Sequence, residues 1–282
     1  MAMTTKPPVP RFADASRLGQ HSFRPYPQAR FAHPGRKPAV SAPHAPSQNQ
    51  LLAALPPEDY ERLLPDLEPV ALPLGWTIYG AGEREKYLYL LTAGIVSQFY
   101  VTQDGASAAF AITGSEGVIG VASILGGEST PSQAVVLNTG YAYRLDAELL
   151  KGELEHVGPL QQLLLRYTQA LIEQAGQVAV CNRHHSLEQR VCRWILSCLD
   201  RSPSNVLTMT HKLIADMLGV RREGITETAG KLQQAGLICC RRRYLAVLDR
   251  PRLEARTCEC YAVVKREYDR LLPKHRQAEA VS

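Results

Sequence analysis

One stretch in the C-terminal part of the chain, Leu207–Leu248, combines helical periodicity, turn signals and basic charge. It predicts a helix from about His211 to Leu218, because Thr210 is a favourable N-cap and apolar residues recur on one face. Gly219 follows directly, and glycine is the preferred residue in the left-handed conformation that ends a helix. A second helix is expected to start near Arg221, with its apolar residues facing the first helix.

Two apolar runs follow, Leu237–Cys240 and Tyr244–Leu248, on either side of Arg241, Arg242 and Arg243. This pattern predicts a two-stranded wing with a basic tip. A helix with basic residues at its N-terminal end fits the DNA major groove, while its partner helix crosses the phosphate backbone. A glycine turn between two short helices also occurs in simple packed pairs, but a basic wing at this distance favours DNA binding.

Charge is concentrated in two segments of the 282-residue chain, whose net charge is +5. Residues 1–47 hold seven Lys/Arg against one acid, and residues 201–250 hold nine against four. Residues 1–49 are rich in proline and lack apolar runs, so we predict a disordered tail there. The tail could touch DNA phosphates as a basic arm or be a solvated extension.

No apolar run approaches the roughly 18 to 20 residues needed to span a bilayer, so we expect a cytoplasmic protein without a membrane partner. The seven cysteines are odd in number and all lie in the C-terminal part, unlike a secreted disulfide framework. They leave zinc binding as a possibility to weigh, since Cys and His are the usual zinc ligands.

The candidate ligands nearest in sequence are Cys181, His184, His185 and Cys192. Cys192 falls in an apolar helical pattern, where a free cysteine behaves as a small hydrophobe, so we expect no metal and no cofactor. Cys258 and Cys260 lie in a predicted amphipathic extension over residues 254–282. Residues two apart on a helix do not face each other, which argues against a redox pair.

The middle of the chain, residues 50–157, starts with a helical segment and continues as short β-prone runs punctuated by glycines. Many short strands at regular spacing favour an antiparallel sandwich or barrel. The expected strands are Glu68–Leu72, Thr77–Tyr79, Tyr87–Leu91, Ile95–Thr102, Ala106–Ile112, Val118–Val121, Ala134–Asn138 and Tyr141–Leu145.

A long helix is predicted over residues 158–182, because an apolar seam recurs every three or four residues. We assign this seam to a dimer interface, although it could instead pack on its own domain; Leu163, Leu165 and Ile172 form a second apolar face. Residues 182–185 then form a candidate hinge, and the S-x-x-Q pattern from Ser186 starts another helix. The seam consists of Leu160, Leu164, Tyr167, Leu171, Gln174 and Val178.

Glycine-punctuated strands, a long helix and a winged helix-turn-helix, in this order, resemble the Crp/Fnr family of bacterial transcription regulators. The most specific motif is Gly219–Ile225, GVRREGI, which is similar to the start of the family's recognition helix; 114–120 and 87–94 match more loosely. The resemblance implies an α+β fold: an N-terminal antiparallel, jelly-roll-like β-roll, a dimerisation helix, and a winged helix-turn-helix over residues 183–253. It also implies a regulator, not an enzyme, that binds double-stranded DNA as a homodimer, with RNA polymerase as a further partner.

The resemblance assigns base contacts to Arg222 and Glu223 and phosphate contacts to His211 and Lys212. Two departures indicate an operator different from the best-known family consensus: Arg221 replaces a Ser/Thr N-cap and Glu227 replaces a basic residue. The complete set expected at DNA is Thr210, His211, Lys212, Arg221, Arg222, Glu223, Thr226, Arg241, Arg242 and Arg243.

The sensor segment departs further from the family. Cyclic-nucleotide-binding members carry G-E-L/I-A and R-S/T-A segments, where this chain has Gly120–Ser123 and Ser132–Ala134. Because a buried cyclic phosphate needs a charge-assisted partner, we predict an effector other than cyclic AMP. A cyclic-nucleotide response through altered contacts is one alternative. A zinc-dependent enzyme using the Cys/His residues is another, although no nucleophile–base signature is present, and a non-DNA-binding adaptor is a third.

No cysteine precedes Cys181, which excludes the N-terminal iron–sulfur ligands of the family's oxygen-sensing branch. Residues 51–155 also lack His and Cys, which argues against heme. The effector therefore stays unidentified at this stage.

Overall fold

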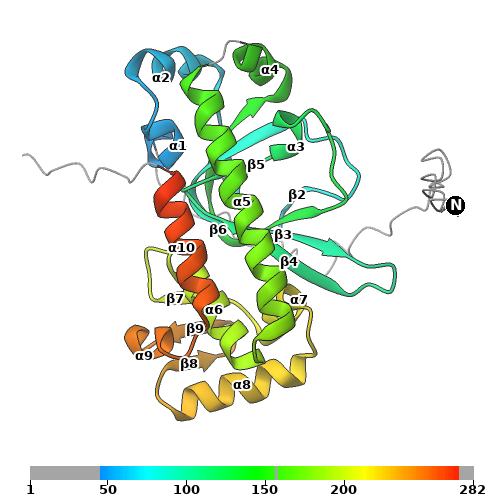
Figure 1. Ribbon diagram of the computed structural model, residues 1–282, viewed down its shortest axis with the longest axis vertical. Coiled ribbons are helices and arrows are strands. Elements are labelled where there is room, and N and C mark those ends of the chain that lie inside the picture. The colour runs from blue at the N-terminus through cyan, green and yellow to red at the C-terminus, as the bar shows by residue number, and fades with distance from the viewer. Residues whose placement is uncertain (1–44, 156–157, 273–282) are drawn as a thin grey trace, which may run out of the picture.

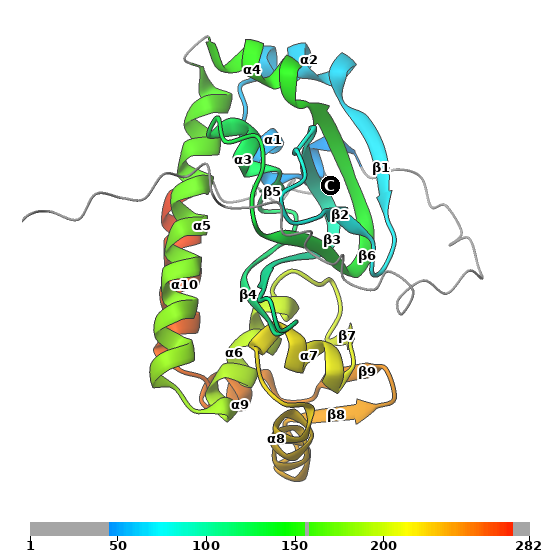
Figure 2. The same cartoon turned by 90° about the vertical axis from the view of Figure 1, so that its right-hand side faces the viewer.

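The computed structural model describes residues 45–155 and 158–272. An N-terminal β domain and a C-terminal helical domain lie at opposite ends of the molecule, and helix α5, Pro159–His184, runs along both (Figure 1). Helix α10, Glu259–Leu271, lies beside α5 in both views (Figures 1 and 2). Within the described residues, every helix is too short or too polar to cross a membrane.

The β domain is a six-stranded sheet with the order β1-β6-β3-β4, in which β2 also pairs with β6 and β5 with β3. Every pairing is antiparallel, which confirms the predicted sheet type. The strands are β1 Glu68–Leu72, β2 Thr77–Tyr79, β3 Tyr87–Val101, β4 Ser107–Thr113, β5 Val118–Ile119 and β6 Gln133–Asp146.

Two pairs of expected strands are in fact single long strands, β3 and β6, so the prediction of turns at Gly94 and Gly140 was wrong. Both glycines lie where the β3–β6 register shifts. Gly94 has φ +92, and a Cβ on Gly140 would stand 2.0 Å from the carbonyl oxygen of Ala93. The glycines therefore allow close backbone approach at bulges and do not reverse the chain.

The described chain starts before the predicted domain boundary. A 3-10 turn covers Pro46–Gln48, and Asn49 caps α1, Gln50–Ala53, by accepting from the Leu51 and Leu52 amides. The buried Asn49 amide also donates to the carbonyls of Leu91 and Gly117, each at 2.9 Å. The expectation of disorder is therefore wrong for residues 46–49, while residues 1–44 lie outside the described residues.

Three helices cover the β domain besides α1 and α5: α2 Pro57–Leu63, α3 Val121–Ile124 and α4 Ala147–Glu155. The start of α3 corrects the expected strand 118–121, which ends at Ile119. Tyr167 of α5 is fully buried against this domain, and its hydroxyl donates to the Val118 carbonyl at 3.0 Å. A Cβ on Gly117 would stand 2.2 Å from the Tyr167 ring, so glycine is required for this packing.

The predicted heptad seam of α5 lies inside its own chain. Every seam residue is at most 9% exposed, and Gln174 accepts from the backbone amide of Ile112 at 3.3 Å. The assignment of this seam to a dimer interface is therefore corrected, because these side chains are already covered by β4 and α10. The corrected residues are Leu160, Leu164, Tyr167, Leu171, Gln174 and Val178.

The opposite face of α5 carries the exposed apolar residues Leu165, Ile172 and Val180. The helix ends at His184, two residues beyond the predicted end at 182. Ser186 then starts the next helix with the predicted capping box, since its hydroxyl accepts from the Gln189 amide at 3.3 Å.

The C-terminal domain contains the predicted winged helix-turn-helix, built on a three-stranded sheet with the order β7-β9-β8. The third strand, β7, was not predicted. Its elements are α6 Leu187–Leu199, β7 Val206–Thr208, α7 His211–Leu218, α8 Arg222–Gln234, β8 Ile238–Arg241, β9 Tyr244–Val247 and α9 Arg250–Glu254.

One apolar core spans both domains, joining Ile95, Phe99 and Ile112 of the sheet to Trp194 and Met217 below it. The β3–β4 hairpin contacts α7 directly, and the Ser107 hydroxyl donates to the Asp216 carbonyl at 2.9 Å. The helix-turn-helix is therefore held against the sensor sheet (Figure 2).

Candidate nucleic-acid interface

The turn between α7 and α8 has the chemistry expected from its sequence. The Thr210 hydroxyl accepts from the Leu213 amide at 3.1 Å, which confirms the N-cap. Gly219 ends α7 with φ +64, and the Val220 amide donates to the Ala215 carbonyl. These bonds satisfy free backbone groups at both ends of α7 and fix the direction in which α8 leaves the turn.

Helix α8 separates an apolar inner face from a polar outer face. Ile225 and Leu232 are fully buried, whereas Arg222, Glu223 and Thr226 are exposed in its first turns. Arg221 is the N-cap residue, with an exposed side chain that makes no capping bond. The N-terminal end of α8 therefore presents a guanidinium and a carboxylate side by side in sequence, away from the protein (Figure 1).

Two predicted phosphate-binding residues of α7 have partners within the protein. His211 is half-buried, and its Nδ1 lies 3.1 Å from the Thr226 hydroxyl of α8. Burial, and then the nearby charge of Arg222, lower the pKa of His211, so the ring is neutral at neutral pH. Lys212 is exposed and forms an i,i+4 ion pair with Asp216.

The wing is a tight hairpin between β8 and β9 with Arg242 and Arg243 at its turn. Arg241, Arg242 and Arg243 are all exposed, and Arg242 has φ +50, a left-handed conformation uncommon for this residue type. The Cys240 amide donates to the Gln233 side chain of α8 at 2.9 Å, which ties the wing to the helix. A basic tip thus lies beside the exposed face of α8.

An unpredicted carboxylate lies in the sensor domain where the family resemblance placed an altered segment. Glu85 is 4% exposed, and its Oε2 accepts from the Ala122 amide at 2.9 Å, in the first turn of α3. Burial raises the pKa of Glu85, partly offset by the backbone amides of Ala122 and Ser123. The free backbone donors that could receive an anion here are therefore already engaged by the chain itself.

The cysteines and histidines considered as ligands separate in the structure. Cys192 is buried in the core shared by the two domains, and His184 is exposed. Cys181 and His185 instead meet Cys258 and Cys260, which come from the α9–α10 junction. Sequence reasoning missed this grouping because 77 positions separate Cys181 from Cys258.

A β-roll joined by a long helix to a winged helix-turn-helix defines a DNA-binding transcription regulator. Residues 69–156 match the model of the cyclic nucleotide-binding domain, and residues 189–256 match the Crp-like helix-turn-helix domain. The chain belongs to the Crp/Fnr family of transcription regulators. Members of this family are not enzymes, so the alternative of a zinc-dependent enzyme is excluded.

Known relatives agree with this assignment. The fumarate and nitrate reduction regulatory protein of Salmonella typhi is 24% identical over 180 residues, covering 61% of this chain and 72% of that protein. FixK2 from Bradyrhizobium japonicum has a similar fold, with a TM-score of 0.59, 20% identity, and 68% and 98% of the two chains covered. A CRP-family transcriptional regulator from Thermus thermophilus gives a TM-score of 0.57 and 21% identity over 66% and 95% of the two chains.

Proposed function

We propose that this regulator reads a pseudo-palindromic operator as a homodimer, under the control of an effector other than cyclic AMP. The observation that carries the proposal is the first turn of α8, where Arg222 and Glu223 are exposed above the buried Ile225. Arginine can bind guanine O6 and N7 with two hydrogen bonds, and glutamate can accept from cytosine N4. These two residues therefore select the half-site sequence.

The phosphate contacts come from residues around this reading end. Lys212 and the wing residues Arg241, Arg242 and Arg243 have exposed cationic side chains suited to the DNA backbone. Thr210, His211, Arg221 and Thr226 complete the proposed interface; of these, Thr210 caps α7 and His211 bonds to Thr226, so both also hold the two helices in place.

A pair of substitutions separates base reading from phosphate contact. Arg222→Ala should relax preference at one base pair by about 1–3 kcal/mol of discrimination. Lys212→Ala should weaken binding to all sequences about equally and reduce the salt slope by roughly one. Binding of both variants to a randomised operator library, at several salt concentrations, provides the measurement. Loss of affinity for all sequences alike in both variants would contradict the assignment of Arg222 to a base.

The dimer is proposed to form through the exposed face of α5. Leu165 and Ile172 are 52% and 64% exposed and lie seven residues apart, and Val180 continues the same side of the helix. Apolar residues at this spacing suit packing of two helices along a common seam. Two α8 helices would then meet successive major grooves about 34 Å apart.

The altered sensor supports an effector without a cyclic phosphate. Glu85 places a buried carboxylate at the first turn of α3, next to the segment that lacks the family's phosphate-binding arginine. A negative charge there disfavours a second anion. Calorimetric titration with cyclic AMP and cyclic GMP tests this: heat of binding at micromolar concentration would favour the alternative, a cyclic-nucleotide response through altered contacts.

The remaining partners follow from the role in transcription. We propose that the protein acts in the cytoplasm and contacts RNA polymerase once bound at its operator. Genomic pull-down should recover an enriched palindromic sequence. Recovery of no enriched sequence would favour an adaptor that dimerises without reading DNA.

A further inference from the structure

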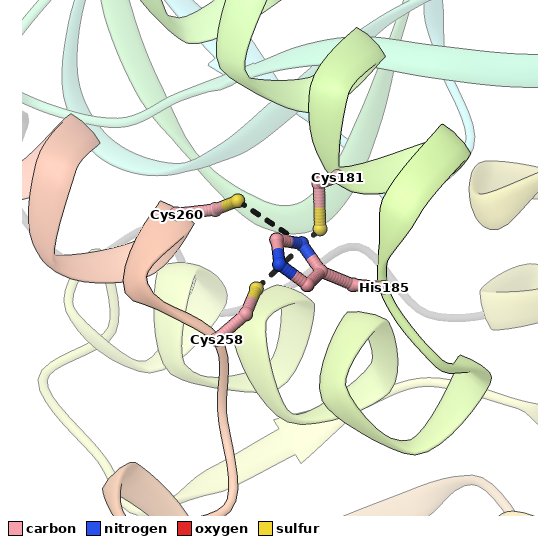
Figure 3. Close-up of side chains that lie close together, drawn as sticks. All are labelled: Cys181, His185, Cys258 and Cys260. Carbon is pink, nitrogen blue, oxygen red and sulfur yellow. Dashed lines mark hydrogen bonds between the residues drawn. The ribbon is translucent and has the colours of Figure 1, made fainter.

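Four potential metal ligands meet at the lower end of α5 (Figure 3). Cys181 belongs to the last turns of α5 and His185 is the residue that ends this helix. Cys258 is the N-cap residue of α10 and Cys260 lies in its first turn. Because Cys258 is in extended conformation and not helical, the two residues of this Cys-x-Cys pair both point toward α5.

The spacing of the four ligand atoms fits a single tetrahedral ion. All four atoms lie within 4.8 Å of one another; the sulfurs of Cys181 and Cys258 are 3.5 Å apart, and Cys260 Sγ is 3.3 Å from His185 Nδ1. With Zn–S near 2.3 Å and Zn–N near 2.0–2.1 Å, a zinc tetrahedron has S–S and S–N edges of about 3.8 and 3.6 Å. The four ligands therefore need to move little to surround a zinc ion.

The groups around the ligands are those that orient a metal site. His185 uses its other nitrogen, Nε2, to contact Glu259 Oε1 at 3.2 Å, so a carboxylate supports the ring that would bind metal through Nδ1. The Gln177 side-chain amide donates to Cys260 Sγ at 3.1 Å, a bond that favours the thiolate. The buried Arg193 acts electrostatically on Cys181 and balances negative charge near the sulfurs.

Two plainer explanations fit the arrangement less well. The three thiols form an apolar cluster of their own, apart from the larger cores, so they do not fill space in either core. A disulfide between Cys181 and Cys258 would leave His185, Glu259 and Cys260 without a common role. An iron–sulfur cluster places its cysteine sulfurs outside a cage of several iron atoms, which needs wider spacing than a single ion does.

We propose that Cys181, His185, Cys258 and Cys260 bind one zinc ion that fastens helix α10 to the junction between α5 and α6. Because this junction connects the sensor domain with the DNA-binding domain, the ion fixes the angle at which α6 leaves α5. The site is structural and closed, since four protein ligands complete the tetrahedron. Zinc binding therefore stabilises the folded position of α10.

The test uses the full-length protein, purified under reducing conditions and stripped of metal with a chelator. Titration with Zn²⁺ should reach one equivalent per chain, and Co²⁺ should give the intense visible bands of a tetrahedral thiolate site. Cys260→Ser should lose stoichiometric zinc, whereas Cys239→Ser, on the wing, should keep it. Glu259→Gln should keep the stoichiometry but weaken Zn²⁺ affinity about 10- to 100-fold, because Glu259 only positions His185.

Wild-type protein that binds less than a tenth of an equivalent of Zn²⁺ would overturn the proposal whatever the variants do. Uptake of iron together with acid-labile sulfide would overturn it as well, in favour of a cluster. Equal loss of zinc in Cys239→Ser and Cys260→Ser would also exclude the four-residue site. Circular dichroism of each variant distinguishes lost metal from lost fold, and limited proteolysis should release α10 faster when zinc is removed.

Discussion

A buried ion pair between Glu116 and Arg201 joins the sensor domain to the DNA-binding domain. The side chains are 14% and 9% exposed, and Arg201 Nε lies 2.5 Å from Glu116 Oε1. Arg201 also donates to the Ser197 carbonyl at 2.8 Å, and its guanidinium lies 5.6 Å from the centre of the Tyr268 ring. Burial lowers the pKa of Arg201, but the adjacent Glu116 charge more than offsets this, so the pKa is raised and the guanidinium stays charged.

Glu116→Gln removes the negative charge and leaves the Arg201 cation buried. Removing one partner of a buried pair costs about 3–5 kcal/mol, because the other charge is left uncompensated. At about 2–4 °C per kcal/mol for a protein of this size, the melting temperature should fall by roughly 6–20 °C. The matched control is Glu153→Gln, whose partner Arg62 has a side chain 53% exposed, and this change should cost less than about 1 kcal/mol.

Thermal unfolding followed by circular dichroism provides the assay, with urea denaturation as a second measure. A double variant, Glu116→Leu with Arg201→Met, should recover most of the stability lost by Glu116→Gln, since replacing both buried charges by apolar groups is often close to neutral. If the Gln variants of Glu116 and Glu153 lost the same stability, or the double variant were worse than the single one, the role assigned to the buried charges would be refuted.

Three further predictions concern the sensor, the dimer face and the reading helix. Because burial raises the pKa of Glu85, the favourable state is the protonated one, and stability is lost as pH rises through the raised pKa; Glu85→Gln should therefore gain stability relative to wild type from about pH 4 to about pH 8 in urea denaturation. Ile172→Glu should shift the protein from dimer to monomer in sedimentation velocity, while Leu125→Glu, similarly exposed on the β domain, should not. Gly230→Ala in α8 should stabilise by about 0.5–1 kcal/mol, since a Cβ there meets no atom within 4 Å, and an unchanged or lower melting temperature would contradict this.

Local patterns predicted the helix-turn-helix well because its determinants are close in sequence. Thr210 caps the helix that follows it, and Gly219 adopts the left-handed conformation that its position after Leu218 indicated. The capping box at Ser186 was likewise formed by residues three positions apart. In each case the bond that fixes the backbone joins near neighbours, so the sequence contains the whole signal.

The sheet was predicted in type but not in connectivity, because a glycine has two structural uses. At Gly219 it ends an element, whereas at Gly94 and Gly140 it lets two strands approach at a bulge. Which use applies depends on the partner strand, which is remote in sequence. The orientation of α5 was misassigned for a related reason: a heptad seam fits a partner helix or the chain's own core equally well, and the packing of β4 and α10 decides.

The cysteine–histidine site shows how far such reasoning from spacing extends. The argument that residues two apart do not face each other holds inside a helix, but α10 begins at Glu259, one residue after Cys258. The helix boundary, which sequence patterns fix least sharply, therefore decides whether Cys258 and Cys260 converge. Their second pair of ligands lies on α5, so only the packing of α10 along α5 brings the site together. A truncation that removes α10 should consequently abolish Zn²⁺ binding while leaving the helix-turn-helix sequence intact, and retention of one equivalent of zinc by that truncated chain would place the metal elsewhere.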